Sequence, residues 1–276
     1  MRDELIITAE RLKQLMVDTP VKLVDASWYL PNQDRSGRTE YLQQRLPGAV
    51  FFDIDAIADT DSGLPHTLAS PAVFSERVGQ LGIGISDTIV VYDGIGMFSS
   101  PRVAWNFRQM GAQGVRVLDG GLPLWIRAGG ELENGIPDEP VPCRFDARPV
   151  DGLSVGLDTV ARHLDASSAV VLDVRPAERF AGQAPEPRPG VRSGHMPGAV
   201  NVPFPELLID GALASNEVLR ARFEAAGVTP DSFVITSCGS GVTATIANLA
   251  LECIGHPRHA LYDGSWSEWG LSLIHI

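Results

Sequence analysis

One stretch of the chain combines a potential nucleophile with a turn suited to holding an anion. It reads Ser237-Cys238-Gly239-Ser240-Gly241-Val242-Thr243-Ala244 and connects a predicted strand at 233–236 to a predicted helix at 243–252. The backbone N–H groups of such a turn converge on its centre, and the start of a helix adds a partial positive charge. An anion is favoured there, and at a cysteine the favoured anion is the nucleophilic thiolate.

Three kinds of chemistry compete for this loop. Gly239, Gly241 and Ala244 satisfy a dinucleotide-binding fingerprint, but too few residues follow Asp263, the candidate ribose ligand, to complete a nucleotide-binding fold. A cysteine phosphatase needs an arginine where this chain has Ala244. Sulfur transfer remains, in which the thiolate takes up a sulfur atom and the turn holds the persulfide anion. The alternative without chemistry is that Cys238 is a small buried hydrophobic residue.

The same landmarks occur twice along the chain, which places this loop in the second of two copies of one domain. Leu23-Val24-Asp25 is matched by Val171-Leu172-Asp173, and Pro47-Gly48-Ala49-Val50 by Pro197-Gly198-Ala199-Val200. Two further matches are 88–92 with 232–236, and 118–121 with 262–265. Each copy alternates short apolar strands with helical patterns, such as the helix predicted at 101–110. The pattern predicts an α/β fold in which each domain has a parallel sheet with helices on both faces.

The predicted division has two domains and a linker. Residues 1–130 form an N-terminal domain without a nucleophile, because Asp93-Gly94-Ile95-Gly96 stands where the second copy has its cysteine loop. Residues 131–152 form the linker and 153–276 the catalytic domain. Within the latter, the proline-rich segment 181–194 is predicted to be a stiff surface loop of the kind that carries function. The apolar last residues, 271–276, are assigned no function.

Composition and charge exclude several classes of protein. Hydrophobic residues make up 44% and charged residues 20%, which excludes a disordered chain. The net charge of −12 disfavours nucleic acid as a partner. No apolar run predicts a membrane helix, and the N-terminus lacks the pattern of a secretory leader. Cys143, Cys238 and Cys253 lack the spacing of a metal or disulfide motif, which predicts a reduced protein of the cytoplasm, with Cys143 and Cys253 as small buried residues.

The repeat and the sequence Cys238-Gly239-Ser240-Gly241-Val242-Thr243 together resemble the rhodanese superfamily, and within it the 3-mercaptopyruvate sulfurtransferases. The resemblance runs from Leu23-Val24-Asp25-Ala26-Ser27-Trp28 to Tyr262-Asp263-Gly264-Ser265-Trp266. It implies two tandem rhodanese-like domains of which only the C-terminal one is catalytic. Cys238 is then the nucleophile, and residues 239–243 cradle its persulfide. The resemblance implies no cofactor, because the cysteine itself carries the sulfur.

The resemblance also implies a pair of substrate-binding arginines. Arg179 and Arg188 match the family's two arginines in spacing and context, and their planar forks suit the carboxylate and carbonyl of a 2-oxo acid. Arg175 and Arg192 lie close enough in sequence to share or exchange this role. From the residues alone, solvated surface arginines are the alternative.

A proton relay is the third implication of the resemblance. It joins Asp55 and His66 of the first copy to Ser240 of the cysteine loop, so that a carboxylate orients an imidazole and the imidazole polarises a hydroxyl. From sequence alone, His66 is an ordinary surface histidine following a proline. The remaining histidines have no carboxylate or cysteine partners at ligand spacing, so no metal site is predicted.

The expected function is the transfer of sulfur from 3-mercaptopyruvate, through a persulfide on Cys238, to a thiol or cyanide, with release of pyruvate. Because Gly239-Ser240-Gly241 is uncharged, the dianion thiosulfate is expected to be a poor donor. The expected partners are a small 2-oxo acid and a thiol acceptor such as a thioredoxin-like protein, with neither nucleic acid nor a membrane. Two alternatives stay open: a thiosulfate sulfurtransferase, and a non-catalytic rhodanese module for sulfur relay or binding.

Overall fold

The computed structural model of the chain describes residues 1–271; residues 272–276 of the apolar ending lie outside the described part. The chain divides into two compact units. The first comprises residues 1–59, 68–150 and 210–213, and the second comprises 60–67, 151–209 and the chain from 214 onward. Residues 60–67 lie within the first unit in sequence but belong to the second. Residues 210–213 lie within the second unit in sequence but belong to the first.

The first unit is built on a five-stranded parallel sheet in the order β1-β5-β4-β2-β3. Its strands are β1 (Ile6–Ile7), β2 (Val21–Asp25), β3 (Val50–Phe51), β4 (Thr88–Tyr92) and β5 (Val115–Leu118). Its helices are α1 (Arg2–Leu5), α2 (Ala9–Asp18), η1 (Pro31–Gln33), α3 (Gly37–Gln43), α4 (Pro71–Gln80), α5 (Ser100–Gln109) and α6 (Gly121–Arg127).

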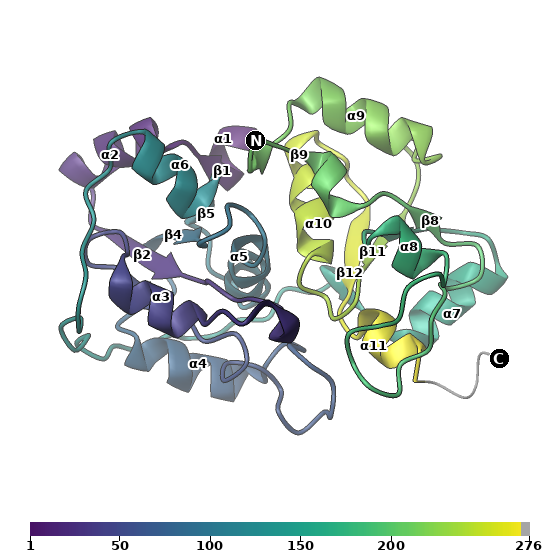
Figure 1. The fold of residues 1–276 in the computed structure, drawn as a ribbon, viewed down its shortest axis with the longest axis horizontal. Coiled ribbons are helices and arrows are strands. Elements are labelled where there is room, and N and C mark those ends of the chain that lie inside the picture. Colours follow the sequence, from purple (N-terminus) through teal and green to yellow (C-terminus); the bar gives the residue numbers. More distant parts are fainter. Residues whose placement is uncertain (272–276) are drawn as a thin grey trace. The chain divides into compact units, whose positions relative to one another are not determined.

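Helices cover both faces of this sheet, because successive strand residues point to opposite sides. Leu23 and Val90 pack on one face in a buried cluster to which α2, α3 and α6 contribute (Figure 1). Helices α4 and α5 contribute to a second cluster of buried aromatic rings, in which the centroids of Phe74 and Phe107 are 5.5 Å apart. The predicted α/β architecture is therefore present in this unit.

Most of the predicted linker packs against the first unit. The Cys143 N–H donates to the Gly79 carbonyl and the Arg148 N–H to the Met110 carbonyl, each over 2.9 Å. Between them, Phe145 is 2% exposed and contacts Phe74 of α4. Residues 131–150 are counted with this unit for that reason.

The second unit repeats the same sheet, in the order β6-β12-β11-β7-β8. Its strands are β6 (Ser154–Val155), β7 (Val170–Asp173), β8 (Val200–Asn201), β11 (Val234–Ser237) and β12 (His259–Tyr262). Its helices are α7 (Leu157–Asp165), α8 (Ala177–Phe180), η2 (Phe204–Leu207), α9 (Asn216–Ala225), α10 (Ala244–Cys253) and α11 (Ser265–Trp269), and the short strands β9 (Leu208–Ile209) and β10 (Ala212–Leu213) lie between η2 and α9 in sequence.

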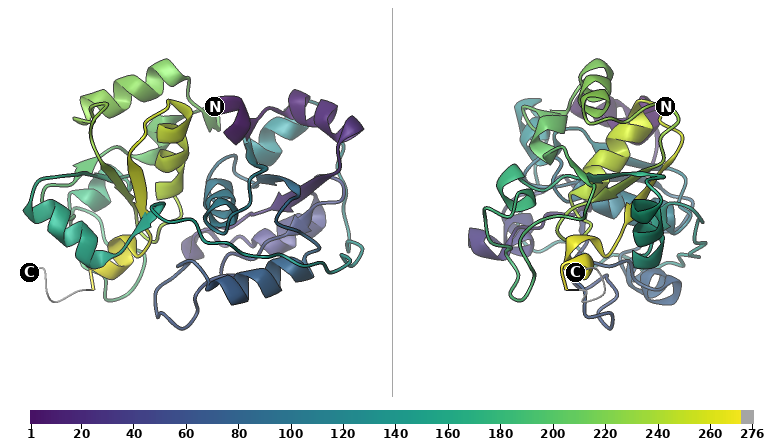
Figure 2. Two further views of the ribbon diagram at one scale, coloured as in Figure 1. Left: turned by 180° about the vertical axis from the view of Figure 1, so that it is seen from behind. Right: turned by 90° about the vertical axis from the view of Figure 1, so that its right-hand side faces the viewer.

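The layers of the second unit follow the same plan. Val160 of α7 and Trp266 of α11 pack with Ile235 of β11 in one buried cluster. Helix α10, which is buried along nearly its whole length, packs against β11 and β12 (Figure 2). Two copies of one topology thus confirm the fold class predicted from the repeated landmarks.

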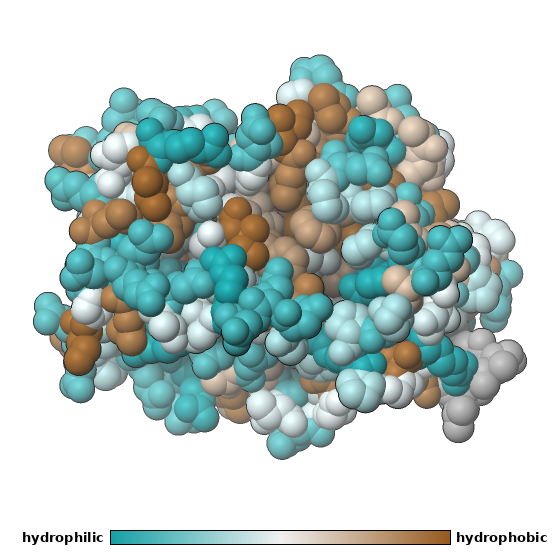
Figure 3. Space-filling view, in the orientation of Figure 1, coloured by the Kyte–Doolittle hydropathy of each residue, from teal (hydrophilic) through white to brown (hydrophobic). Residues whose placement is uncertain are grey.

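Hydrophilic side chains cover most of the face drawn in Figure 3, and apolar side chains are visible between them. The most exposed large apolar side chains are Val17 on α2 and Ile136 and Val141 on the segment that follows the first unit's last helix. Among residues 1–271, no helix has both the length and the apolar character needed to cross a bilayer.

Candidate active site

Cys238 lies directly after β11, where the chain turns into α10. Its side chain is buried, with 2% exposed. The Cys238 N–H donates to Ser265 Oγ over 3.2 Å, and its carbonyl accepts from the Trp266 N–H over 2.9 Å. These two bonds fix the backbone of Cys238 to the start of α11.

The rest of the loop is held in the same way and has little side-chain bulk. The Gly239 carbonyl accepts from both the N–H and the hydroxyl of Ser267, over 2.8 and 2.6 Å. Gly241 has a φ of 75°, in the left-handed region that favours glycine. With no side chain at residues 239 and 241, an anion can approach the backbone N–H groups of the turn closely.

Ser265 is a site residue that the sequence analysis used only as a landmark. Its φ of 49° lies in the left-handed region, which is uncommon for a residue other than glycine. The matching residue of the first copy is Gly121, with a φ of 51°. The serine hydroxyl donates to the Tyr262 carbonyl over 2.9 Å while it accepts from Cys238. The sequence clue was the replacement of glycine by serine at a repeated landmark.

The structure brings together Ser240 and His66, two members of the predicted relay that are far apart in sequence. Ser240 Oγ lies 3.0 Å from His66 Nδ1, and the two residues are 6% and 4% exposed. His66 is on the segment 60–67 and has a φ of 63°. Such strained backbone tends to occur at functional sites. A histidine that is ordinary in the sequence is therefore buried against the hydroxyl of the cysteine loop.

Asp55, the third predicted member of the relay, belongs to the first unit. Its carboxylate accepts a hydrogen bond from Trp28 Nε1 over 3.0 Å. The part that Asp55 plays in the relay stays a prediction.

Arg179 of α8 lies beside the cysteine loop. A Cβ built on Gly239 would be 3.1 Å from Arg179 Nη2. The guanidinium forms an ion pair with Glu186 of the proline-rich segment. Arg188, in the same segment, is partly exposed, and its contact with substrate stays a prediction.

Arg175, an alternative candidate for the substrate clamp, is engaged elsewhere. Its side chain is 1% exposed, and it donates to both carboxylate oxygens of Asp173, to Glu186 Oε1 and to the Gly194 carbonyl. The guanidinium also lies over the Trp266 ring, 4.5 Å from its centroid. A guanidinium bonded in this way is structural and is not available to a substrate.

The other two cysteines differ from each other. Cys253 is buried, as expected, whereas Cys143 is exposed because it lies on the segment that runs along the outside of the first unit. All three cysteines are free thiols. In the part of the chain that the structure describes, no group of three or more His, Cys, Asp or Glu side chains is arranged to hold a metal ion.

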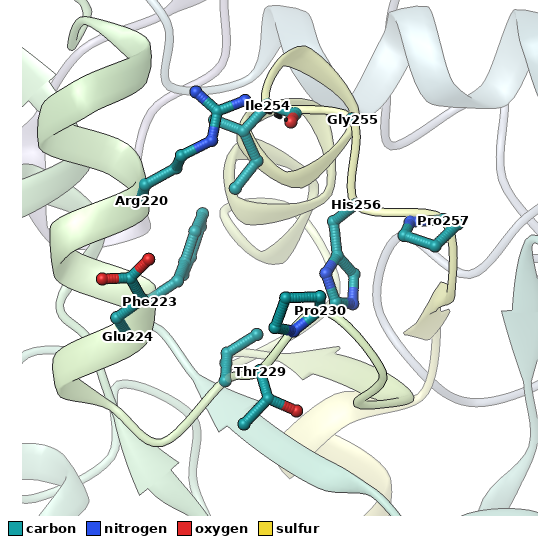
Figure 4. A pocket seen from close by; sticks show the side chains of 10 residues that line it. Arg220, Phe223, Glu224, Thr229, Pro230, Ile254, Gly255, His256 and Pro257 are labelled. Atoms are coloured by element: carbon teal, nitrogen blue, oxygen red, sulfur yellow. Dashed lines mark hydrogen bonds between the residues drawn. The ribbon is translucent and has the colours of Figure 1, made fainter.

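A pocket of about 240 Å³ lies elsewhere in the second unit (Figure 4). It is lined from α9 and from residues 254–257, so it sits at the end of α10 opposite to the cysteine loop. Two of its polar side chains contact backbone carbonyls. Arg220 donates to the Ile254 carbonyl over 2.7 Å, and His256 Nε2 lies 2.9 Å from the Ser232 carbonyl oxygen. No cysteine lines this pocket, and we assign it no part in the chemistry.

The family model described as the rhodanese-like domain matches residues 8–128 and again residues 157–272. The chain belongs to the rhodanese family. In this rhodanese the two matched segments contain all strands of the two sheets except the edge strands β1 and β6, and the cysteine loop lies in the second segment.

Relatives of this rhodanese carry closely related names. The 3-mercaptopyruvate sulfurtransferase of Escherichia coli (strain K12) is 41% identical over 268 residues, which cover 96% of this chain and 94% of the relative. The 3-mercaptopyruvate sulfurtransferase of Homo sapiens is 39% identical, with 95% and 89% covered. The thiosulfate/3-mercaptopyruvate sulfurtransferase 2 of Arabidopsis thaliana is 37% identical, with 97% and 84% covered.

Solved structures show the same similarity. The crystal structure of SseA from Escherichia coli, described under the rhodanese fold and catalytic mechanism of 3-mercaptopyruvate sulfotransferases, has a TM-score of 0.87 and 38% identity. The alignment covers 95% of this chain and 98% of that one. Tum1 from Saccharomyces cerevisiae has a TM-score of 0.88 and 31% identity, with 96% and 94% covered.

Proposed function

We propose that this rhodanese is a 3-mercaptopyruvate sulfurtransferase in which Cys238 is the catalytic cysteine. The observation that carries the proposal is the position of Cys238, between a strand and a buried helix, in a turn whose residues 239 and 241 have no side chains. The similarity to sulfurtransferases over nearly the whole chain supports the choice of donor.

The reaction requires two transfers of one sulfur atom. The Cys238 thiolate attacks the sulfur of 3-mercaptopyruvate, and the carbon–sulfur bond breaks with its electron pair moving onto carbon. Pyruvate leaves as its enolate and takes up a proton. The persulfide on Cys238 is stabilised by the N–H groups of residues 239–243 and by the start of α10. An acceptor thiolate then attacks the outer sulfur and releases the cysteine thiolate, so no cofactor is needed.

Polar side chains bind the donor and supply a proton to the enolate in this scheme. Arg179 and Arg188 bind the carboxylate and carbonyl of the 2-oxo acid. Ser240 and His66, whose polar atoms are 3.0 Å apart, supply the proton to the enolate, and Asp55 orients the imidazole. The acceptor is a small thiol, cyanide or a thioredoxin-like protein. Three free thiols support a reducing compartment, for which we propose the cytoplasm.

The choice between 3-mercaptopyruvate and thiosulfate rests on charge. Gly239 and Ser240 put no positive side chain into the turn, and a dianionic donor would gain from one. A relative named for both donors makes thiosulfate the second candidate. We expect 3-mercaptopyruvate to be strongly preferred.

The test mixes the purified protein with each donor in turn. Intact mass without an acceptor should increase by one sulfur atom, and pyruvate should be released from 3-mercaptopyruvate when dithiothreitol is added as acceptor. No added sulfur and no pyruvate would exclude the proposed enzyme. Equal turnover with thiosulfate would instead contradict the interpretation of the neutral loop.

A further inference from the structure

Glu186 is a buried carboxylate in a segment that the sequence predicts to be a surface loop. Its side chain is 3% exposed. One oxygen, Oε1, accepts from Arg175 Nη1 over 2.7 Å and from Arg179 Nε over 3.3 Å, and the other, Oε2, pairs with Arg179 Nη2. The carboxylate therefore joins a structural guanidinium to the one beside the cysteine loop.

This chain of ion pairs is anchored in the sheet. Asp173 is the last residue of β7, and both of its carboxylate oxygens accept hydrogen bonds from the Arg175 guanidinium. Arg175 in turn holds Glu186, and Glu186 holds Arg179. The four side chains carry two positive and two negative charges, so Arg179 is neutralised and oriented before an anionic donor arrives. A buried carboxylate shared by two forked donors has little freedom to turn.

The position of Arg179 also explains why residue 239 has no side chain. A Cβ at Gly239 would lie 3.1 Å from Arg179 Nη2, closer than an ordinary van der Waals contact. The free end of an arginine normally moves aside easily, but Glu186 holds this one in place. A side chain at residue 239 and the guanidinium of Arg179 thus compete for one space.

We infer that Glu186 is a positioning residue that fixes the Arg179 guanidinium against Gly239, where it meets the carboxylate of the donor. The inference rests on the proposed function, because it assigns Arg179 to the donor. Glu186 acts only through Arg179 and does not itself contact the donor.

The first experiment compares Glu186→Gln with Glu178→Gln by steady-state kinetics with 3-mercaptopyruvate. Glu178 is an exposed residue one position before Arg179, which makes it a matched control. We expect kcat/KM to fall about ten-fold in Glu186→Gln, mainly through KM, and to change less than about two-fold in Glu178→Gln. In an Arg179→Ala background, Glu186→Gln should cause no further loss. Additive losses, or a lower KM in Glu186→Gln caused by the extra positive charge, would overturn the inference.

The second experiment leaves Glu186 itself unchanged, so it does not depend on the folding of Glu186 variants. Because the turn also holds the persulfide, Gly239→Ala should act in both backgrounds, but it should raise KM several-fold more in the wild-type background than in the Arg179→Ala background, where the space beside residue 239 is empty. Equal increases in both backgrounds would overturn the inference. Failure of the wild type to release pyruvate would instead exclude the proposed function itself, whereas turnover insensitive to Glu186 would exclude only the role of this residue.

Discussion

The loops after β4 and β11 occupy the same place in two copies of one fold, and they satisfy their backbone donors differently. In the first unit, Asp93 fills the loop with its own carboxylate and is 1% exposed. The donors to it are the backbone N–H groups of Ile95, Gly96, Ser99 and Ser100 and the hydroxyl of Ser100. In the second unit the matching residue is Cys238. The turn of the first unit thus holds a carboxylate through its own N–H groups, whereas the corresponding turn of the second unit begins with a cysteine.

A second difference lies at the end of the neighbouring strand. Asp173 of β7 is followed two residues later by Arg175, which pairs with it. Asp25 of β2 is followed at the same spacing by Ser27, whose N–H donates to Asp25 Oδ1 over 2.9 Å. Burial raises the pKa of Asp25 to about 6. At this position the arginine and the ion pairs that it forms belong to the unit that contains Cys238.

The largest effect is expected from the residue that distinguishes the loops. Cys238→Ser should reduce turnover of 3-mercaptopyruvate at least ~1000-fold while the protein stays folded, because an alcohol is neither ionised nor able to accept sulfur. Pyruvate release measures the turnover, and circular dichroism shows whether the variant is folded. Cys253→Ser is the matched control and should retain catalysis. Appreciable activity in Cys238→Ser would mean that the loop is not the site of sulfur transfer.

The next effect tests the carboxylate in the other loop. Asp93→Ala leaves several buried N–H groups without an acceptor and should lower the free energy of unfolding by about 3 kcal/mol. Asp93→Asn, which keeps one acceptor oxygen, should cost less. Added sodium formate should raise the Tm of Asp93→Ala more than that of the wild type, since formate can replace the lost carboxylate. A variant as stable as the wild type would show that this turn does not require an anion.

A smaller effect is expected at the start of α11, where the two units have serine and glycine. Ser265→Gly removes the hydroxyl that accepts from the Cys238 N–H and also relieves the left-handed backbone strain at residue 265. We expect kcat to fall about ten-fold while the Tm stays the same or rises. Unfolding curves and steady-state kinetics on one preparation would separate the two effects. A loss of Tm in proportion to the loss of activity would reduce Ser265 to a structural role.

The elements of the fold were predictable because their signals are local. The strand predicted at 88–92 is β4 without change, and the predicted helix 243–252 is α10 shifted by one residue. Apolar runs and repeated turns needed no knowledge of tertiary contacts. The segment 181–194 was less well predicted, because its prolines indicate a surface loop and do not show that Glu186 is buried between two arginines.

From local patterns in the sequence alone, the site was predictable only at Cys238 and its turn. The glycine turn around Cys238 carries its own chemistry in the sequence, whereas the Ser265 hydroxyl matters only because folding brings it to the Cys238 N–H. His66 was indistinguishable from a surface histidine until the fold buried it against Ser240. Contacts between residues far apart in sequence leave no local pattern, and for this pair only the family resemblance indicated the partner.

The smallest expected effect concerns the pH dependence that Asp25 gives the first unit. Because its pKa is raised from 3.8 to about 6, the folded protein holds this proton more tightly than the unfolded chain does. Folding therefore carries a free-energy cost for the ionised Asp25 carboxylate. This cost is absent at low pH, grows as the pH rises from about 4 to about 6, and stays constant above that. Asp25→Asn should remove this cost. The free energy of unfolding of the variant, measured with urea relative to the wild type, should therefore increase by about 1 kcal/mol from about pH 5 to about pH 7. Asp173→Asn should instead destabilise at both pH values, because it deprives the buried Arg175 of a counter-ion. A gain from Asp25→Asn that is equal at both pH values would show that the Asp25 carboxylate is charged throughout this range.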